Sequence, residues 1–392
     1  MTLDLRFGVA SDLHIGLPHT IQNHPSRFHL VEVSVPAFET VLEHLSQLDV
    51  DFLLIPGDLT QHGEPENHAW LAQRLADLPF PTYVIPGNHD VPVPEPDGTS
   101  IGWKDFPGHY RQFGYGERNE LFYTTSLAPG VRLIALNSNQ FNDEGKQIGW
   151  VDEAQLQWLS QTLAECSNEL ILVTIHHNIL EHIPDQTLHP IGRRYMLGNA
   201  PELLEILQSA NVRLVFTGHL HVQDIAHRQG IFDITTGSLV SYPHPYRVIH
   251  LQQDAMGNAY LKVESHRVKS VPDWPDLQQA SREWMGDRSL PFVTYMLTQP
   301  PLSLGQREAL RIAPKLKYFW AAIAEGDPEF DFPDFPDGIR EHFESFSHRH
   351  SQEIQLNLQD NHFHVQLGQT NRASAPLSPQ SKKMLNFEAV EL

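Results

Sequence analysis

Histidine and carboxylate side chains recur in five short motifs along the first 221 residues. The motifs are Asp12-Leu13-His14, Gly57-Asp58, Gly87-Asn88-His89-Asp90, His176-His177 and Gly218-His219-Leu220-His221. Imidazole nitrogen together with carboxylate and amide oxygen suits Mn, Fe or Zn, whereas calcium sites use oxygen alone and thiolate sites need cysteine. These residue types therefore indicate a transition-metal site.

Each motif taken singly also has an ordinary structural explanation. An Asp-x-His sequence in a loop is more often a turn, Gly-Asn-His-Asp is a turn sequence, and His176-His177 could lie in the core or at the surface. The chain has 24 histidines, so chance clustering is a real alternative. For a metal site, Asp12 and His14 are expected on an extended segment, where alternate residues point the same way. Gly57 is expected to permit a close approach of the backbone.

Short apolar runs rich in branched residues predict the strands that position these motifs. The runs cover 6–10, 52–55, 82–85, 131–136, 170–175 and 212–217. Stretches at 35–48, 68–78, 152–163 and 201–209 predict helices between them. Strand–helix alternation is typical of an α/β fold, in which ligand sites gather at the carboxyl ends of strands. All five motifs follow predicted strands, so we expect them to converge in space.

The order of the motifs resembles the calcineurin-like metallophosphoesterase superfamily over residues 5 to about 250. The resemblance implies a four-layer α/β/β/α sandwich. It implies one metal held by Asp12, His14, Asp58 and His221, and a second held by Asp58, Asn88, His176 and His219. Asp58 would bridge the two. His177 is expected either in the core or beside the ligands.

The implied chemistry uses two divalent or mixed-valence transition metals, with Mn or Fe expected first and Zn possible. Two ions ~3.5–4 Å apart would acidify a shared water, which attacks phosphorus as hydroxide. By resemblance, His89 contacts the phosphate or protonates the leaving oxygen, and Asp90 orients His89. The alternative for Asp90 is a helix N-cap.

A narrower resemblance is to the bacterial class III cyclic-nucleotide phosphodiesterases. It rests on Leu136-Asn137-Ser138, Gln155-Leu156-Gln157-Trp158-Leu159, Gly237-Ser238-Leu239-Val240 and Tyr246-Arg247. Asn137 stands where that subgroup usually has Asp, and Arg247 is expected either in a structural ion pair or facing an anionic ligand. The resemblance implies a phosphodiesterase acting on a cyclic nucleotide such as 3',5'-cAMP. A phosphomonoesterase or other phosphohydrolase is the first alternative, and an inactive partner-binding scaffold, disfavoured by the complete ligand set, is the second.

Composition limits the partners. The 48 Asp and Glu outnumber the 27 Lys and Arg, for a net charge of −21 that repels phosphate backbones. We therefore expect a small-molecule phosphoester and no bulk nucleic-acid binding. The single cysteine, Cys166, excludes an intramolecular disulfide and fits a reducing compartment. Residues 1–7 lack signal-peptide features, and no apolar stretch approaches the ~20 residues of a membrane span, so the protein is expected in the cytoplasm.

The strand–helix rhythm ends near Arg267. We predict a catalytic domain over 1–267, a mainly helical accessory region over 272–368 and a disordered tail over 369–392. Within the accessory region, helices are expected at 304–324 and 338–346 and a hairpin at 354–358 and 363–367. The apolar face of 304–324 must be covered, by the catalytic domain, where it would reach the rim of the site, or by a second subunit in a homodimer. An added layer without functional role is the alternative. The Pro- and Gly-rich segment 91–130 is expected beside the site.

Overall fold

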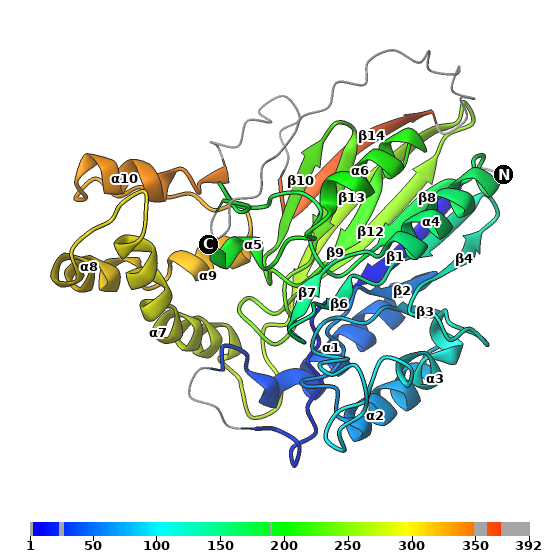
Figure 1. Cartoon of the computed structure of the whole chain (residues 1–392), viewed down its shortest axis with the longest axis horizontal. Helices are drawn as coiled ribbons and strands as arrows, with labels where there is room; N and C mark the ends of the chain where they lie inside the picture. The colour runs from blue at the N-terminus through cyan, green and yellow to red at the C-terminus, as the bar shows by residue number, and fades with distance from the viewer. Residues whose placement is uncertain (1–2, 23–26, 189, 349–358, 370–392) are drawn as a thin grey trace.

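The computed structural model describes residues 3–22, 27–188, 190–348 and 359–369, and two six-stranded sheets form its centre (Figure 1). The first sheet has the order β14 (His362–Gln369), β13 (Asn258–Arg267), β12 (Pro245–Gln253), β1 (Asp4–Val9), β2 (Phe52–Ile55) and β3 (Thr82–Val84). The second has the order β10 (Asp224–Arg228), β11 (Ile231–Thr235), β9 (Leu214–Thr217), β8 (Leu170–Thr174), β5 (Val131–Ala135) and β4 (Tyr123–Ala128). A small sheet pairs β6 (Asn139–Phe141) with β7 (Gln147–Gly149).

Side chains of β5 alternate between two apolar clusters, as the period of a strand requires. Leu133 and Ala135 belong to the cluster that joins the two sheets. In the same cluster the rings of Phe7 in β1 and Phe216 in β9 meet edge to face, with centroids 5.6 Å apart. Ile134 points the other way, into the cluster under the helices of the second sheet. The two sheets therefore pack face to face, and the outer face of each sheet is also apolar and must be buried by other elements.

Helices cover those outer faces. The first sheet carries α1 (Ser34–Gln47) and α2 (Pro65–Ala76), and the second carries α4 (Glu153–Glu165) and α6 (Ala200–Ser209) (Figure 1). This arrangement confirms the four-layer α/β/β/α sandwich. All six predicted strands and all four predicted helices of this part are present, and their ends differ from the predicted ones by three residues at most. The helices α3 (Phe106–His109) and α5 (Pro190–Arg193) are single turns.

The strands that precede the motifs run parallel. β1 pairs in parallel with β2 and β2 with β3, while β5, β8 and β9 form a second parallel set. Their carboxyl ends consequently lie at one edge of each sheet, which is where an α/β fold places its ligand site. The antiparallel strands β4 and β10, and the pair β12 and β13, were not predicted. In β12 and β13, Arg, His, Lys and Glu stand among the apolar residues, so neither strand is a continuous apolar run.

The C-terminal region is mainly helical, as predicted. It contains α7 (Leu277–Thr298), α8 (Gln306–Ile312), α9 (Phe319–Glu325) and α10 (Asp337–Glu344). The helix predicted over 304–324 is divided, because a 3₁₀ turn with Pro314 separates α8 from α9. The longest helix, α7, was missed, since it contains Pro291 and an interior proline normally argues against a helix.

These helices pack against the catalytic part of the same chain. Leu220, Val222 and Tyr242, which follow β9 and β11, share an apolar cluster with residues of α7 to α10. Residues of the sandwich thus pack against the apolar face of 304–324. The strand β14 then returns to the first sheet and pairs antiparallel with β13. Its residues include 363–367, which were predicted as half of a hairpin; the other half, 354–358, lies outside the described residues.

The predicted tail, 369–392, also lies outside the described residues except for Gln369, which ends β14. Within the part of the chain that is described, no helix combines the length and the apolar character needed to cross a bilayer. Cys166 is buried and unpaired, in agreement with the absence of a second cysteine.

Arg247 in β12 is fully buried and ties the two sheets together. Its guanidinium donates to the hydroxyl of Ser265 at 3.0 Å and to the carbonyl oxygen of Asp360 at 2.5 Å. It also donates to the carbonyl oxygens of Asp224 at 3.2 Å and Thr235 at 2.8 Å. Burial lowers the pKa of Arg247 to about 10, which keeps it charged at neutral pH. The structural alternative therefore holds, although its hydrogen-bond partners are carbonyl and hydroxyl oxygens rather than the predicted carboxylate.

The loop after β8 is fixed to the edge of the second sheet through His182. Its Nδ1 lies 2.5 Å from a carboxylate oxygen of Asp224, and its Nε2 lies 3.3 Å from one of Asp233. The same Asp233 oxygen accepts the backbone N–H of Ile179 at 2.8 Å and of Leu180 at 3.0 Å. Burial alone would lower the pKa of His182, but the two carboxylates outweigh it and raise the pKa to about 10.

Candidate metal centre

The backbone turns sharply at five of the seven predicted ligands. Asp12, His14, Asp58, His219 and His221 have φ angles of 52°, 42°, 50°, 68° and 61°. Non-glycine residues seldom adopt this left-handed conformation, and such strain concentrates at functional sites. The prediction that Asp12 and His14 lie on an extended segment is therefore wrong. The chain instead bends at each of these residues just beyond the end of a strand, and the side chains turn into a shared space.

One group of potential ligand atoms contains Asp12, His14, Asp58 and His221. These four side chains each offer an atom within 4.8 Å of the others. Nε2 of His221 lies 3.0 Å from Oδ1 of Asp12 and 3.4 Å from Nε2 of His14. The set is the one that the resemblance implies for the first metal.

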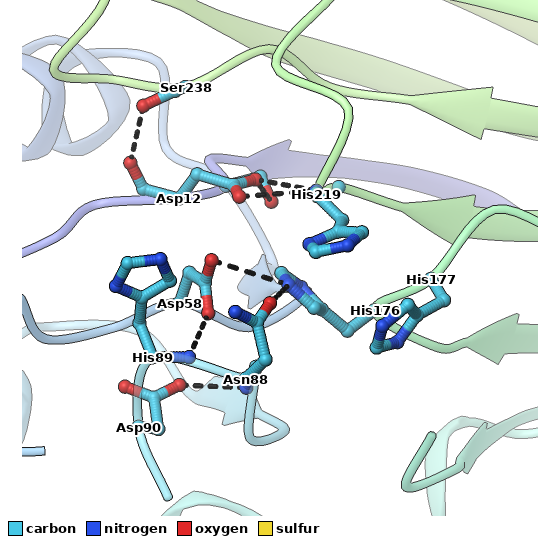
Figure 2. Close-up of polar contacts among 12 residues, drawn as sticks. Asp12, Asp58, Asn88, His89, Asp90, His176, His177, His219 and Ser238 are labelled. Atoms are coloured by element: carbon cyan, nitrogen blue, oxygen red, sulfur yellow. Dashed lines mark hydrogen bonds and ion pairs between the residues drawn. The ribbon is translucent and has the colours of Figure 1, made fainter. Parts of the chain in front are cut away.

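A second group shares Asp58 with the first. Asp58, His176 and His219 offer atoms within 4.8 Å of one another, and Oδ1 of Asn88 lies 3.2 Å from Nε2 of His176 (Figure 2). A single oxygen, Oδ2 of Asp58, lies 3.4 Å from Nε2 of His176 and 3.7 Å from Nε2 of His14. Asp58 thus stands between the two groups, which is the position of a bridging carboxylate.

Close backbone contacts hold these loops in register. Nδ1 of His176 bonds to the carbonyl oxygen of Pro56 at 2.8 Å, which leaves Nε2 directed into the site. At Gly57, where φ is 97°, a Cβ atom would lie only 2.5 Å from Nδ1 of His176. At Gly87 a Cβ atom would lie 2.1 Å from Oδ1 of Asp58. The expected close approach at Gly57 is confirmed, and Gly87 makes a second one that was not foreseen.

The environment of Asp90 differs from both predicted roles. Its carboxylate accepts the backbone N–H groups of Gly87, Leu59 and Thr60 at 2.8, 3.0 and 2.8 Å. The ring of His89 is oriented by a different group, because its Nδ1 bonds to the carbonyl oxygen of Gln61 at 2.7 Å. Burial and the charge of Asp58 raise the pKa of Asp90 to about 7. Asp90 therefore binds the Asp58 loop to the Asn88 loop, and it neither orients His89 nor caps a helix.

His89 lies next to the first group of ligand atoms. Its backbone N–H donates to Oδ1 of Asp58 at 2.8 Å (Figure 2), and its ring centroid is 4.6 Å from that of His14. The carboxylate of Asp12 is held in a similar way, by the backbone N–H of His219 at 3.1 Å. Backbone N–H groups thus hold the carboxylates of both Asp58 and Asp12 in place.

The charges of the site suit cation binding. Burial first, and then the neighbouring histidines, lower the pKa of His14 and of His219, so both imidazoles are neutral. Burial would raise the pKa of Asp58, but His176 and His89 outweigh it and hold the pKa well below its usual value. His176 differs, because Asp58 outweighs the effect of burial and raises its pKa to about 9, so a metal would have to displace the proton of this imidazole. Neutral imidazoles and an ionised carboxylate are the forms that coordinate metals.

Two further histidines belong to this neighbourhood. His29 offers a nitrogen within 4.8 Å of ligand atoms of His14 and His221, and nothing in its sequence context separated it from the other histidines. His177 packs its ring 4.3 Å from that of His219, and its Nδ1 bonds to the hydroxyl of Ser138 at 2.8 Å. His177 therefore lies beside the ligands, the second of its two expected positions.

Asn137 and Gln155, which belong to the segments of the narrower resemblance, help to hold the loop of Asn88 through hydrogen bonds. Gln155 bonds through its side chain to the backbone N–H and carbonyl of Asn137, both at 2.8 Å. The Asn137 side chain in turn accepts the backbone N–H of Asn139 at 3.0 Å, and Asn139 donates to the carbonyl oxygen of Pro86 at 2.8 Å. These contacts connect α4 to the loop that presents Asn88.

A cavity of about 550 Å³ opens onto both groups. Its lining includes residues of the catalytic loops, of the loop after β8 and of the C-terminal helices: Phe28, His29, Asp58, Asn88, His89, Gln147, Ile148, Gly149, His177, Arg194, Tyr195, His219, Leu220, His221, Ser241, Met285, Phe292 and Trp320. The segment 91–130, expected beside the site, contributes no described residue to this lining. It packs on α2 instead, where the hydroxyl of Tyr110 lies 2.8 Å from Nδ1 of His68.

Comparison with known proteins identifies the family of this chain. A family profile described as calcineurin-like phosphoesterase matches residues 5–223, more than half of the chain. The chain belongs to the calcineurin-like phosphoesterase family. Membership supports the predicted class of enzyme, a hydrolase of phosphoric esters, and it supports the binding of divalent metals.

Relatives within the family are bacterial proteins of modest similarity. A probable cyclic nucleotide phosphodiesterase of a Synechococcus species is 34% identical over 191 residues, which are 48% of this chain and 65% of that protein. A 3',5'-cyclic-nucleotide phosphodiesterase of a Nostoc species is 26% identical over 50% of this chain and 65% of its own length. A probable glycerophosphodiester phosphodiesterase of Arcobacter nitrofigilis is 25% identical over 61% of this chain and 80% of its own length. The chain thus spans just under two thirds of the first and second of these relatives.

A solved structure shows the same fold. The crystal structure of a dimetal phosphatase from Danio rerio is similar with a TM-score of 0.51 and 15% identity, over 67% of this chain and 96% of that one. The side chains of the two groups in this chain also fit the metals that the family implies. The donor set consists of imidazole nitrogen, carboxylate oxygen and one amide oxygen, without thiolate, and this set favours Mn, Fe or Zn.

Proposed function

We propose that this protein is a two-metal phosphodiesterase that hydrolyses 3',5'-cyclic nucleotides. The observation that carries the proposal is the position of Asp58, whose Oδ2 lies between His14 and His176 at 3.7 and 3.4 Å. One ion would be held by Asp12, His14, Asp58 and His221, and the other by Asp58, Asn88, His176 and His219. When bound, two such ions supply an acidified water and positive charge for the phosphoryl oxygens.

The chain's own residues would contribute the proton and the positioning. His89 bonds to the carbonyl of Gln61 through Nδ1, so its Nε2 is the nitrogen left for substrate. We assign this Nε2 to the phosphate or to the leaving oxygen, which it would protonate when the ring carries a hydrogen on both nitrogens. Asp90 keeps the loops of Asp58 and Asn88 at a fixed separation, so its part in the reaction is to position two ligands.

The diester class is favoured by the names of the relatives. The Synechococcus and Nostoc proteins are named for cyclic nucleotides and the Arcobacter protein for glycerophosphodiesters, and all three names denote diester hydrolysis. Hydrolysis of glycerophosphodiesters is therefore the second candidate. Mn or Fe, with Zn as the alternative, remain the proposed metals. A homodimer and a cytoplasmic location stay predictions.

A substrate panel tests the proposal. Protein loaded with Mn is assayed with 3',5'-cAMP, 3',5'-cGMP, a glycerophosphodiester, bis-p-nitrophenyl phosphate and p-nitrophenyl phosphate. We expect higher kcat/KM for diesters than for the monoester, and the highest for a cyclic nucleotide. Asp58→Ala, prepared in parallel, reports any contaminating phosphatase. Equal kcat/KM for the two p-nitrophenyl esters would contradict the phosphodiesterase assignment.

A further inference from the structure

The C-terminal helices form one side of the cavity that contains the metal-binding groups. Met285 and Phe292 come from α7, and Trp320 comes from α9. The rings of Phe292 and Trp320 meet edge to face with centroids 5.4 Å apart, and both side chains are half-buried. Phe28 adds a fourth apolar side chain from the N-terminal part. We call these four residues the apolar wall.

The wall is held in place by contacts outside the cavity. Trp284 of α7 donates from its indole N–H to the carbonyl oxygen of Phe28 at 3.1 Å. Arg288, one turn further along α7, donates to the carbonyl oxygen of Arg27 at 2.9 Å and lies over the Trp284 ring at 3.2 Å. These contacts join α7 to the segment that carries Phe28 and His29. The wall is therefore preformed, which reduces the entropy lost when a ligand binds against it.

The wall offers no charge to a ligand. Among the described residues that line the cavity, histidines apart, the charged side chains are Asp58 and Arg194. Asp58 belongs to the metal-binding groups, and Arg194 is exposed and lies over the ring of Tyr195 at 4.7 Å. A charged substituent placed against the wall would lose water without gaining a partner. The wall therefore favours a substituent that is neutral and largely apolar on its faces.

One polar group in the lining lacks a partner. The hydroxyl of Ser241 is buried, with 3% of the residue exposed, and it makes no hydrogen bond within the described part of the chain. Buried hydroxyl groups in proteins are nearly always satisfied, and an unpaired one is costly. Because Ser241 lines the cavity, a ligand that enters it can supply the missing partner.

We infer that the apolar wall receives a planar aromatic substituent of the phosphodiester, of nucleobase chemistry, and that Ser241 bonds to its polar edge. This inference rests on the proposed function and assigns the residues that recognise the base of its substrate. A planar base presents apolar faces to Phe292 and Trp320 and hydrogen-bonding atoms at its rim. A glycerol group would instead bring hydroxyl groups against aromatic rings. The cavity, about 550 Å³, lies within the range of roughly 300–1,000 Å³ found for small-molecule sites.

The test uses two substrates with the same leaving group. Thymidine 5'-p-nitrophenyl phosphate carries a nucleobase, and methyl p-nitrophenyl phosphate carries none. The measured quantity is the ratio of their kcat/KM values in Mn-loaded full-length protein. Because loss of base stacking costs ~1–3 kcal/mol, Trp320→Ala should lower this ratio ~5–150-fold. Ser241→Ala, which removes one hydrogen bond of ~0.5–1.5 kcal/mol, should lower it ~2–10-fold.

Matched variants separate this effect from a general loss of structure. Trp158→Ala removes a half-buried tryptophan that packs at a tilted angle against Phe122, with centroids 4.7 Å apart, and should leave the ratio unchanged. Elemental analysis should give the same metal content in all variants. If Trp320→Ala is insoluble, Phe292→Leu takes its place, and it should also lower the ratio of the two kcat/KM values. A ratio that stays at the wild-type value in the wall variants would overturn the inference.

The substrate panel separates failure of the proposed function from failure of base binding by the wall. If wild-type protein does not hydrolyse a cyclic nucleotide but the wall variants lower the ratio, the proposed substrate fails and the wall stands. If cyclic nucleotides are hydrolysed and the wall variants leave the ratio unchanged, the proposed function stands and base binding by the wall is refuted.

Discussion

Gly87→Ala offers a direct test of how Asp58, the proposed bridging carboxylate, is positioned. A Cβ atom at this residue would lie 2.1 Å from Oδ1 and 2.2 Å from the backbone nitrogen of Asp58. Ordinary contacts at a Cβ begin near 3.4 Å, so the two loops must separate by more than 1 Å. The obstacle is backbone as well as side chain, and rotation of Asp58 cannot relieve it.

The size of the effect follows from this displacement. Metal–ligand distances tolerate about ±0.2 Å, and a misplacement of about 1 Å at a reacting centre costs on the order of 10²-fold in rate. Asp58 contributes to both groups of ligand atoms, so both ions should be affected. We therefore expect Gly87→Ala to bind Mn ~10–100-fold more weakly, as when a supporting residue is lost, and to lower kcat/KM by ~10²-fold or more.

Calorimetric titration with Mn and assay with bis-p-nitrophenyl phosphate measure the two quantities, and urea unfolding shows whether the variant is folded. The matched control is Gly108→Ala, because Gly108 is exposed in α3 and a Cβ there would meet nothing within 4 Å. The control should be as stable as the wild type or slightly more so. Wild-type affinity and rate in Gly87→Ala would refute the reasoning, since the loops would then be free to separate without disturbing Asp58.

Three further outcomes are expected. Asp58→Ala should lose both ions by elemental analysis, whereas His89→Ala should keep them and lose ~10²–10⁴-fold in rate; full activity of His89→Ala on a diester with a poor leaving group would exclude it as a general acid. His29→Ala should weaken Mn binding ~10–100-fold, and an unchanged isotherm would remove His29 from the metal environment. Burial lowers the pKa of His182, but its two carboxylate partners outweigh burial and raise the pKa to about 10, against about 6.5 in the unfolded chain. The stabilisation of the fold by protonated His182 is therefore complete below pH ~6.5 and disappears as the pH rises towards 10. In metal-free protein, the difference in unfolding free energy between wild type and His182→Gln should shrink over that range, and a constant difference would contradict the pairing.

The parallel strands and the order of the ligands were predictable because both leave local signals. Buried parallel strands such as β2 and β8 are continuous apolar runs, and the motifs follow their ends directly. The strand β13 was missed because it is not a continuous apolar run. Its buried residues Ala259, Leu261 and Val263 alternate with less buried ones, which is the pattern of a strand with one covered face. The helix α7 was hidden by Pro291, which only the surrounding packing makes tolerable.

At the site, the identity of the grouped residues was predictable and their local geometry was not. The left-handed backbone at Asp12 and His219 depends on contacts with remote loops, such as the N–H of His219 on the Asp12 carboxylate. The role of Asp90 was likewise set by distant N–H groups rather than by its neighbour His89. His29 gave no signal, since its proximity to His14 arises from tertiary folding.

The pairing of β14 with β13 changes how the C-terminal region should be dissected. The chain leaves the first sheet at the end of β13, passes through α7 to α10 and rejoins the sheet at the adjacent position. The helices are thus an insertion between two neighbouring strands and have both ends anchored to the same edge. Truncation at residue 272 removes a sheet strand along with the helices, so its effects would have two sources. Excision of 272–358, with a short linker from β13 to β14, preserves the sheet and isolates what the helices contribute. Because Leu220, which lies between His219 and His221, packs on these helices, exchanging the insertion for one of different shape would also change the support of this loop.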